Sequence, residues 1–167
     1  MPDYRETYKC ESIRHGHSER MKLLIEELLC LEGKQSRVVL IGKSQGSAVS
    51  ASVCSARVAR ASKIVGLILL GGENPLSYNR QLVRPDVPLI SVIHASGDRV
   101  IHPETMIQLS GSWNMQSCHI LPSQQPQGSK DLCFNDIAHA FLEKNLFRAS
   151  MEIIKSILQT CETITIN

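Results

Sequence analysis

The sequence predicts an α/β fold, with a mostly parallel sheet and helices on both faces. Short apolar runs alternate with helical patterns along most of the 167 residues, which favours parallel strands joined by helical crossovers. The run Ile64–Leu70 reads I-V-G-L-I-L-L, and a strand without polar alternation is typical of one buried on both faces. The run Arg37–Ile41 leads through a glycine-flanked turn into a small-residue helical pattern. We expect a single domain over residues 1–167.

The individual elements follow from periodicity and from turn residues. Met21, Leu24, Leu28 and Leu31 recur at helical spacing within Glu19–Leu31, which predicts a helix with these residues on its apolar face. Ser18 is expected to cap this helix and Gly33 to end it. Residues 73–88 and 122–130, rich in proline or in small polar residues, are predicted loops. The remaining expected elements, in chain order, are strand Arg37–Ile41, helix Ser47–Ala61, strand Ile64–Leu70, strand Leu89–His94, helix Pro103 to about Leu109, strand Ser117–Leu121, and a final helical region, with a break, from Asp136 or Ile137 to about Leu158.

Composition excludes several classes of function. The chain is 43% hydrophobic and 20% charged, with a net charge of +2 and 4% aromatic residues, so there is no basic surface to suggest nucleic-acid binding. No apolar run approaches the roughly 18 residues that a membrane span requires. Residues 1–11 are polar and lack the hydrophobic core of a signal peptide. The expected location is the cytoplasm.

The six cysteines are scattered along the chain, with neither a C-x-x-C pair nor a zinc-like spacing with histidine. Most of them fall inside predicted apolar elements, where free thiols pack as small hydrophobic groups. We therefore expect reduced, structural thiols and no metal. The cysteines are Cys10, Cys30, Cys54, Cys118, Cys133 and Cys161.

The turn after the first predicted strand places a serine between two glycines. Gly42, Ser44 and Gly46 have the spacing G-x-S-x-G. A sharp strand-to-helix turn leaves no room for side chains two residues on either side of its apex, and it holds the serine hydroxyl out at the carboxyl edge of the sheet. Ser44 is therefore a candidate nucleophile.

Two other interpretations of these residues stay open. Gly42-Lys43-Ser44 is also the end of the phosphate-binding pattern G-x-x-x-x-G-K-[ST], but Arg37 stands where that pattern needs its first glycine. The residues before Lys43 also read as strand and not as a flexible loop. Alternatively, Ser44 is simply a serine in an ordinary turn.

A serine nucleophile needs a base and an acid. In the predicted parallel α/β sheet, candidates for both roles follow later strands of the chain. Asp98 lies in a turn after Leu89–His94, and His139 lies near the start of the final helical region. Each has an ordinary interpretation, as a turn-forming aspartate and as a surface histidine. The order serine, acid, histidine is that of one large hydrolase class. The rivals are Glu73 for the acid and His102 and His119 for the base. His119 and His94 lie within predicted strands, which favours packed side chains, and His15 and His17 lie too near the N-terminal loop to be the usual base.

Three segments together resemble the α/β-hydrolase superfamily: G-K-S-Q-G at 42–46, V-I-H-A-S-G-D-R-V-I-H-P at 92–103, and H-A-F at 139–141. The segment I-R-H-G-H-S at 13–18 is similar to a loop, R-G-H-G-x-S, found in many members. The resemblance covers about residues 13–158. It implies that Ser44 is the nucleophile, Asp98 the acid and His139 the base, and that the backbone N–H of Gln45 forms half of the oxyanion hole. The x-S-Q-G turn looks similar to that of carboxylesterases and acyl-thioesterases.

The chain departs from this family at its N-terminal end. Members usually have about three more strands before the loop that residues 13–18 resemble, so we expect a truncated α/β-hydrolase fold. The missing part normally supplies the second oxyanion donor, whose loss costs on the order of 10²–10³ in rate. An open sheet edge would also invite pairing with another chain. Lys43 is unusual beside a nucleophile, and either favours an anionic substrate or is simply solvated.

Two hypotheses about function follow. The first is a serine hydrolase that cleaves a carboxylic ester or thioester through an acyl-enzyme on Ser44, without a metal or organic cofactor. Its acyl pocket is expected to be small and aliphatic, shaped by residues 73–88 and 122–130. The second is a non-catalytic binding or assembly module, with the open edge as a homodimer interface.

Overall fold

The computed structural model describes residues 37–55, 63–77, 82–123, 137–141 and 143–164, together with residues 16, 19–21, 23, 24 and 27. Its centre is a four-stranded parallel sheet in which each strand pairs with the next strand along the chain. The predicted α/β fold is therefore confirmed. The strands are β1 (Val38–Lys43), β2 (Ile64–Leu70), β3 (Leu89–Ala95) and β4 (Ser117–Leu121).

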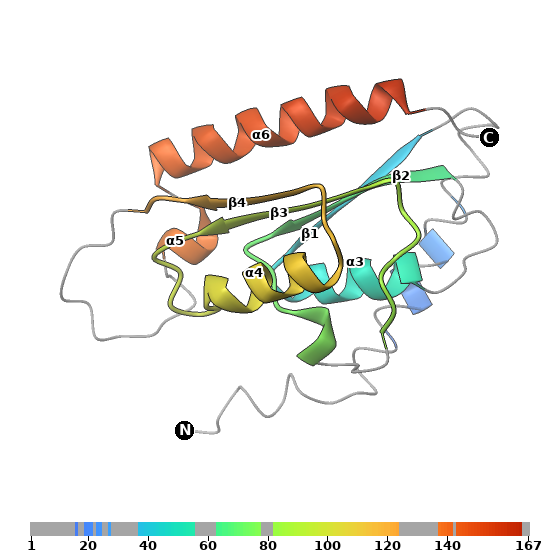
Figure 1. Cartoon of the computed structure of the whole chain (residues 1–167), viewed down its shortest axis with the longest axis horizontal. Coiled ribbons are helices and arrows are strands. Elements are labelled where there is room, and N and C mark those ends of the chain that lie inside the picture. Colours follow the sequence, from blue (N-terminus) through green and yellow to red (C-terminus); the bar gives the residue numbers. More distant parts are fainter. Residues whose placement is uncertain are drawn as a thin grey trace.

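Helices cover both faces of the sheet, as expected (Figure 1). Helices α3 (Gln45–Ser55) and α4 (Pro103–Ser112) lie on one face, and the long helix α6 (Lys144–Thr163) lies on the other. The short helix α5 (Ile137–Ala140) lies near the ends of β3 and β4, and a 3₁₀ turn, η2 (Pro75–Ser77), follows β2. The three segments that carry Ser44, Asp98 and His139 thus follow β1, β3 and β4, at the carboxyl ends of parallel strands.

The core explains why β2 reads as an unbroken apolar run. Leu67 and Leu69 of β2 pack into a cluster with residues of α3 and α4, whereas Ile68 packs into the cluster beneath α6. Strand β3 is buried along its whole length. A strand covered on both faces favours apolar side chains on either side, so the alternating pattern is lost. The two polar side chains that β3 carries, Ser91 and His94, are both hydrogen-bonded.

The predicted bounds agree best in the strands and least in the helices. Strands β2 and β4 have the predicted bounds, whereas β1 continues to Lys43 and α3 begins at Gln45 instead of Ser47. The final region is two helices, because Phe141 adopts a left-handed φ of 58° between them. Helix α6 also continues past the predicted end to Thr163.

Some predicted elements lie partly outside the described residues. Of the helix expected at Glu19–Leu31, the described residues 19–21, 23, 24 and 27 are helical. Met21 packs against the core as its spacing predicts, but Leu24 is half exposed, so that spacing was a wrong guide for Leu24. The end of the helix expected to reach Ala61, and most of the 122–130 loop, lie outside the described residues.

The described thiols agree with the expectation of free cysteines. Cys54, Cys118 and Cys161 form no disulfide, and burial raises the pKa of the Cys54 thiol to about 12, which makes it a poor nucleophile. Cys10, Cys30 and Cys133 lie outside the described residues. Among the helices that are described, none has both the length and the apolar character that crossing a bilayer demands.

The turn from β1 into α3 is tight on one side only. A Cβ on Gly42 would collide with the backbone of Gly46 and lie 2.6 Å from the Cα of Ser47. The hydroxyl of Ser47 donates a 2.6 Å hydrogen bond to the Gly42 carbonyl across the same contact. A Cβ on Gly46, by contrast, would meet nothing within 4 Å. The expectation that both glycines avoid collisions is correct for Gly42 and wrong for Gly46.

This asymmetry predicts opposite effects of two alanine substitutions. Gly42→Ala forces the β1–α3 turn apart and is expected to lower the free energy of unfolding by about 3 kcal/mol or more. Gly46→Ala is expected to be neutral or to stabilise by up to about 1 kcal/mol, because alanine favours the helix that begins there. Urea denaturation followed by circular dichroism measures both. Equal destabilisation by the two variants would contradict this account of the turn.

Candidate active site

Ser44 sits at the apex of the β1–α3 turn in a strained backbone conformation. Its φ is 54°, a left-handed value that non-glycine residues adopt at a cost. Two hydrogen bonds to the end of β2 and the residues after it hold Ser44 there: its N–H donates to the Leu70 carbonyl at 3.1 Å, and its carbonyl accepts from the Glu73 N–H at 3.3 Å. Because β1 remains a strand through Lys43, the phosphate-binding-loop interpretation of these residues is wrong.

The structure brings together the three residues that the sequence singled out. His139 Nε2 lies 3.0 Å from Ser44 Oγ, and His139 Nδ1 lies 2.9 Å from Asp98 Oδ2. Since a carboxylate only accepts, Nδ1 carries the proton and Nε2 is left as the acceptor for the serine hydroxyl. The imidazole therefore links a hydroxyl to a buried carboxylate in the tautomer that a general base requires.

Asp98 is buried, with 2% of its surface exposed, and its carboxylate is surrounded by donors. Oδ1 accepts hydrogen bonds of 2.9 Å from the N–H groups of Val100 and Ile101. Oδ2 faces His139 and, at 3.3 Å, Nε2 of His94. Burial raises the pKa of Asp98, but the hydrogen bonds from His139, His94 and Ile101, with the charge of His139, outweigh burial. The net pKa lies well below its ordinary value.

The segment that carries His139 is anchored just after the histidine. Phe141 closes a turn by donating its N–H to the Ala138 carbonyl at 3.1 Å, and its ring is buried in the core. That ring packs against Gly71, where a Cβ would lie 2.9 Å from Phe141 Cε2. The left-handed backbone of Phe141 is thus held by core packing, and His139 is held with it.

Lys43 provides another contact to the same segment. Its ammonium group donates a 3.0 Å hydrogen bond to the carbonyl of Ala140, next to His139 in the chain. The sequence left two roles open for this cation, contact with an anionic substrate or simple solvation. The structure instead shows it joining the nucleophile's strand to the histidine's segment, a contact that local sequence could not indicate because 97 positions separate the two residues.

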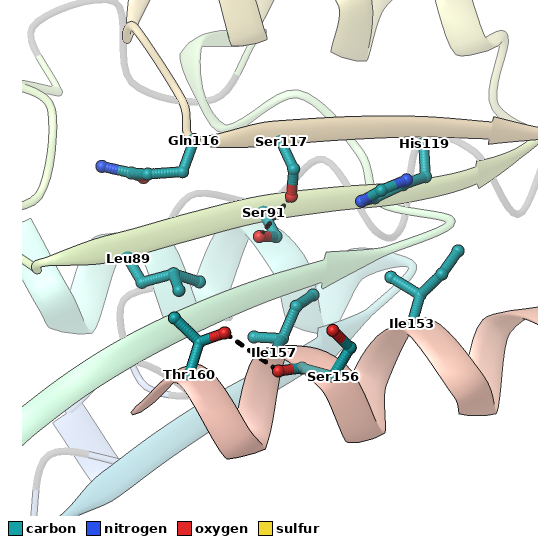
Figure 2. Close-up of a pocket in the computed structure, with 9 residues that line it drawn as sticks. All are labelled: Leu89, Ser91, Gln116, Ser117, His119, Ile153, Ser156, Ile157 and Thr160. Carbon is teal, nitrogen blue, oxygen red and sulfur yellow. Dashed lines mark hydrogen bonds between the residues drawn. The ribbon is translucent and has the colours of Figure 1, made fainter. Parts of the chain in front are cut away.

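The rival candidates lie elsewhere or have other contacts. His102 is exposed and precedes α4, 4.0 Å from Glu104. His119 lies on β4 and lines a groove between the sheet and α6, beside the hydrogen-bonded hydroxyls of Ser91 and Ser117 (Figure 2). The backbone of Glu73 contacts Ser44, whereas the carboxylate seen against His139 is that of Asp98. His15 and His17 lie outside the described residues.

His94 is the residue of this site whose contact the sequence analysis missed. Its side chain on β3 is completely buried, and its Nε2 lies against both Asp98 and the Ile101 carbonyl, the latter at 2.9 Å. The sequence signal that could have found this contact was a histidine four residues before the candidate acid, near the end of a largely apolar strand.

Gln45 is the first residue of α3, directly after Ser44. The first N–H groups of a helix have no partner within the helix and carry a partial positive charge. The N–H of Gln45 therefore belongs to a natural donor site for a negative oxygen formed at Ser44. Among the residues that the structure describes, no cluster of three or more histidine, cysteine or acidic side chains is arranged to hold a metal.

Comparisons with protein-family models, with curated proteins and with solved structures found no match to this chain. The case for the site therefore depends on its geometry.

The low pKa of Asp98 predicts how stability depends on pH. Because the folded-state pKa lies below that of the unfolded chain, the unfolded chain binds the extra proton first as the pH falls. The contribution of Asp98 is complete above about pH 5 and is lost progressively toward about pH 2. We expect Asp98→Asn to flatten the fall in the free energy of unfolding over this range, as measured by urea denaturation.

The matched control is Asp86→Asn, which removes an exposed carboxylate and is expected to leave the pH dependence as in the wild type. A wild-type slope in Asp98→Asn would contradict the role assigned to the donors around Asp98.

Proposed function

We propose that this protein is a serine hydrolase that cleaves a carboxylic ester or thioester through an acyl-enzyme on Ser44. The observation that supports the proposal is the position of one imidazole, 3.0 Å from Ser44 Oγ and 2.9 Å from Asp98 Oδ2. A buried carboxylate, an oriented base and a strained serine at a strand-to-helix turn are the parts that acyl transfer requires. The resemblance of the three segments to the α/β-hydrolase superfamily is consistent with this chemistry.

In the first half of the proposed reaction, Ser44 Oγ attacks the carbonyl carbon while His139 Nε2 accepts the serine proton. Asp98 stabilises the resulting imidazolium and keeps its Nδ1–H oriented. The N–H of Gln45 donates to the oxyanion of the tetrahedral intermediate. When the intermediate collapses, the bond to the alcohol or thiol breaks, and His139 returns the proton to this leaving group.

In the second half, His139 removes a proton from water, which attacks the acyl-Ser44 carbonyl. Collapse of the second intermediate releases the carboxylic acid and restores the Ser44 hydroxyl. Every proton moves through His139 Nε2, so the reaction has no need of a cofactor.

The first test is covalent labelling with a fluorophosphonate probe, which reacts with a serine that a base has activated. We expect the wild type to label and Ser44→Ala and His139→Ala to lose labelling by about 10³-fold or more, because nucleophile and base act as one unit. Folding of each variant is checked by circular dichroism.

The matched controls are Ser112→Ala and His102→Ala, which change an exposed serine and an exposed histidine on or next to α4. Both are expected to label as the wild type does. A folded wild-type protein that does not label would contradict the hydrolase proposal. If the wild type labels, a panel of short-chain esters and thioesters would identify its preferred substrate.

A second candidate function is a binding or assembly module that pairs through the edge of the sheet. Within the described residues, β1 pairs with β2 alone, and Ile41 on this strand is 47% exposed. An unpaired strand edge with an exposed apolar side chain favours addition of another strand, so a homodimer through β1 is the proposed assembly.

Light scattering of the wild type and of Ile41→Lys tests this interface. We expect a wild-type dimer, and a monomer for the variant, because a lysine on an edge strand disfavours strand pairing. A wild-type monomer at concentrations of about 100 μM, above the dissociation constants of most specific dimers, would contradict the interface.

A cytoplasmic location is part of the proposal too, since the free thiols of Cys54, Cys118 and Cys161 suit a reducing compartment.

A further inference from the structure

A second histidine contacts the candidate acid of the site. His94 is completely buried at the end of β3, and its Nε2 lies 2.9 Å from the Ile101 carbonyl and 3.3 Å from Asp98 Oδ2. Both neighbours are acceptors, so Nε2 carries the proton. The other ring nitrogen, Nδ1, is buried with no hydrogen-bond partner among the described residues. A buried acceptor without a partner is unfavourable, so packing alone gives no reason for an imidazole at this position.

The contacts of Asp98 show what the ring can contribute. Both backbone donors, from Val100 and Ile101, bind Oδ1. Rotation about the Cβ–Cγ bond moves both oxygens together, so a donor on Oδ2 restrains the carboxylate in addition to the two donors on Oδ1. Apart from His139 itself, His94 is the donor seen against Oδ2.

His94 also braces the turn that carries the acid. The Ile101 carbonyl accepts from His94, and the Ile101 N–H donates to Asp98 Oδ1. One ring nitrogen thus contacts both ends of the segment 98–101. An orienting group that does not depend on the base itself is what a preorganised site requires.

We infer that His94 is a positioning residue, whose Nε2–H sets the orientation of Asp98 and through it the hydrogen bond between Asp98 and His139. The inference deepens the proposed function, since it assigns a support to the acid of the proposed triad. His94 does not touch the reacting atoms, so its effect is transmitted by the direction of Asp98 Oδ2.

Two variants separate positioning from packing. His94→Phe keeps a ring in the core but removes the donor, whereas His94→Gln places an amide N–H near the position of Nε2. We expect His94→Phe to slow fluorophosphonate labelling by about tenfold or more and His94→Gln to stay within about threefold of the wild type. If His94 only packs, the folded fraction of His94→Phe labels at the wild-type rate, and the inference is overturned.

Proton and nitrogen NMR of protein that carries isotope-labelled histidine tests the inference without any need for activity. In the wild type we expect His94 in the Nε2–H tautomer, and a low-field His139 Nδ1–H resonance that shifts or broadens in His94→Phe and is kept in His94→Gln. An Nδ1–H tautomer for His94 in the wild type would overturn the inference, even if His94→Phe failed to fold. If the wild type does not label at all, the hydrolase proposal fails while these resonances still decide the role of His94.

Discussion

The site depends on the close approach of helix α3 to the end of strand β1. Gly42 lets the backbone at Gly46 and Ser47 pass where any side chain would collide, and Ser47 closes the contact with its hydrogen bond to the Gly42 carbonyl. This approach forces the intervening residue, Ser44, into a left-handed conformation. The same contact extends to the residues just after β2, because a Cβ on Gly72 would collide with the Ser47 side chain. The serine is therefore held by packing of three neighbouring segments.

A buried carboxylate is the second constraint, because the groups that it requires around it also orient the site. An ionised group in the interior is costly unless donors replace the water that it loses. Asp98 is surrounded by two backbone N–H groups and two imidazoles. The donors that make the burial of Asp98 tolerable also determine the direction of its carboxylate. The same hydrogen bonds therefore stabilise the charge of Asp98 and orient the ring of His139. The segment of His139 is held from outside as well, by the Phe141 ring in the core and by Lys43.

The elements that the sequence predicted best are those with a strong local cause. Strands β2 and β4 have the predicted bounds, since burial selects apolar side chains all along β2 and the turns around these strands are local. The break between α5 and α6 was expected, but its cause was not, because the backbone of Phe141 is determined by packing against Gly71. The reason offered for Gly46 was wrong, since the collision in this turn lies on the side of Gly42 alone.

The sequence by itself determined the α/β class and the three residues that meet at the site, Ser44, Asp98 and His139. It did so because each follows a separate apolar strand, and parallel strands bring their carboxyl ends to one edge of the sheet. Only the tertiary structure decided that the His139 imidazole lies between the other two, that Lys43 joins the strand of Ser44 to the segment of His139, and that His94 reaches Asp98. These contacts depend on how the segments pack in three dimensions, and neither periodicity nor spacing in the sequence encodes the direction of a side chain across that distance.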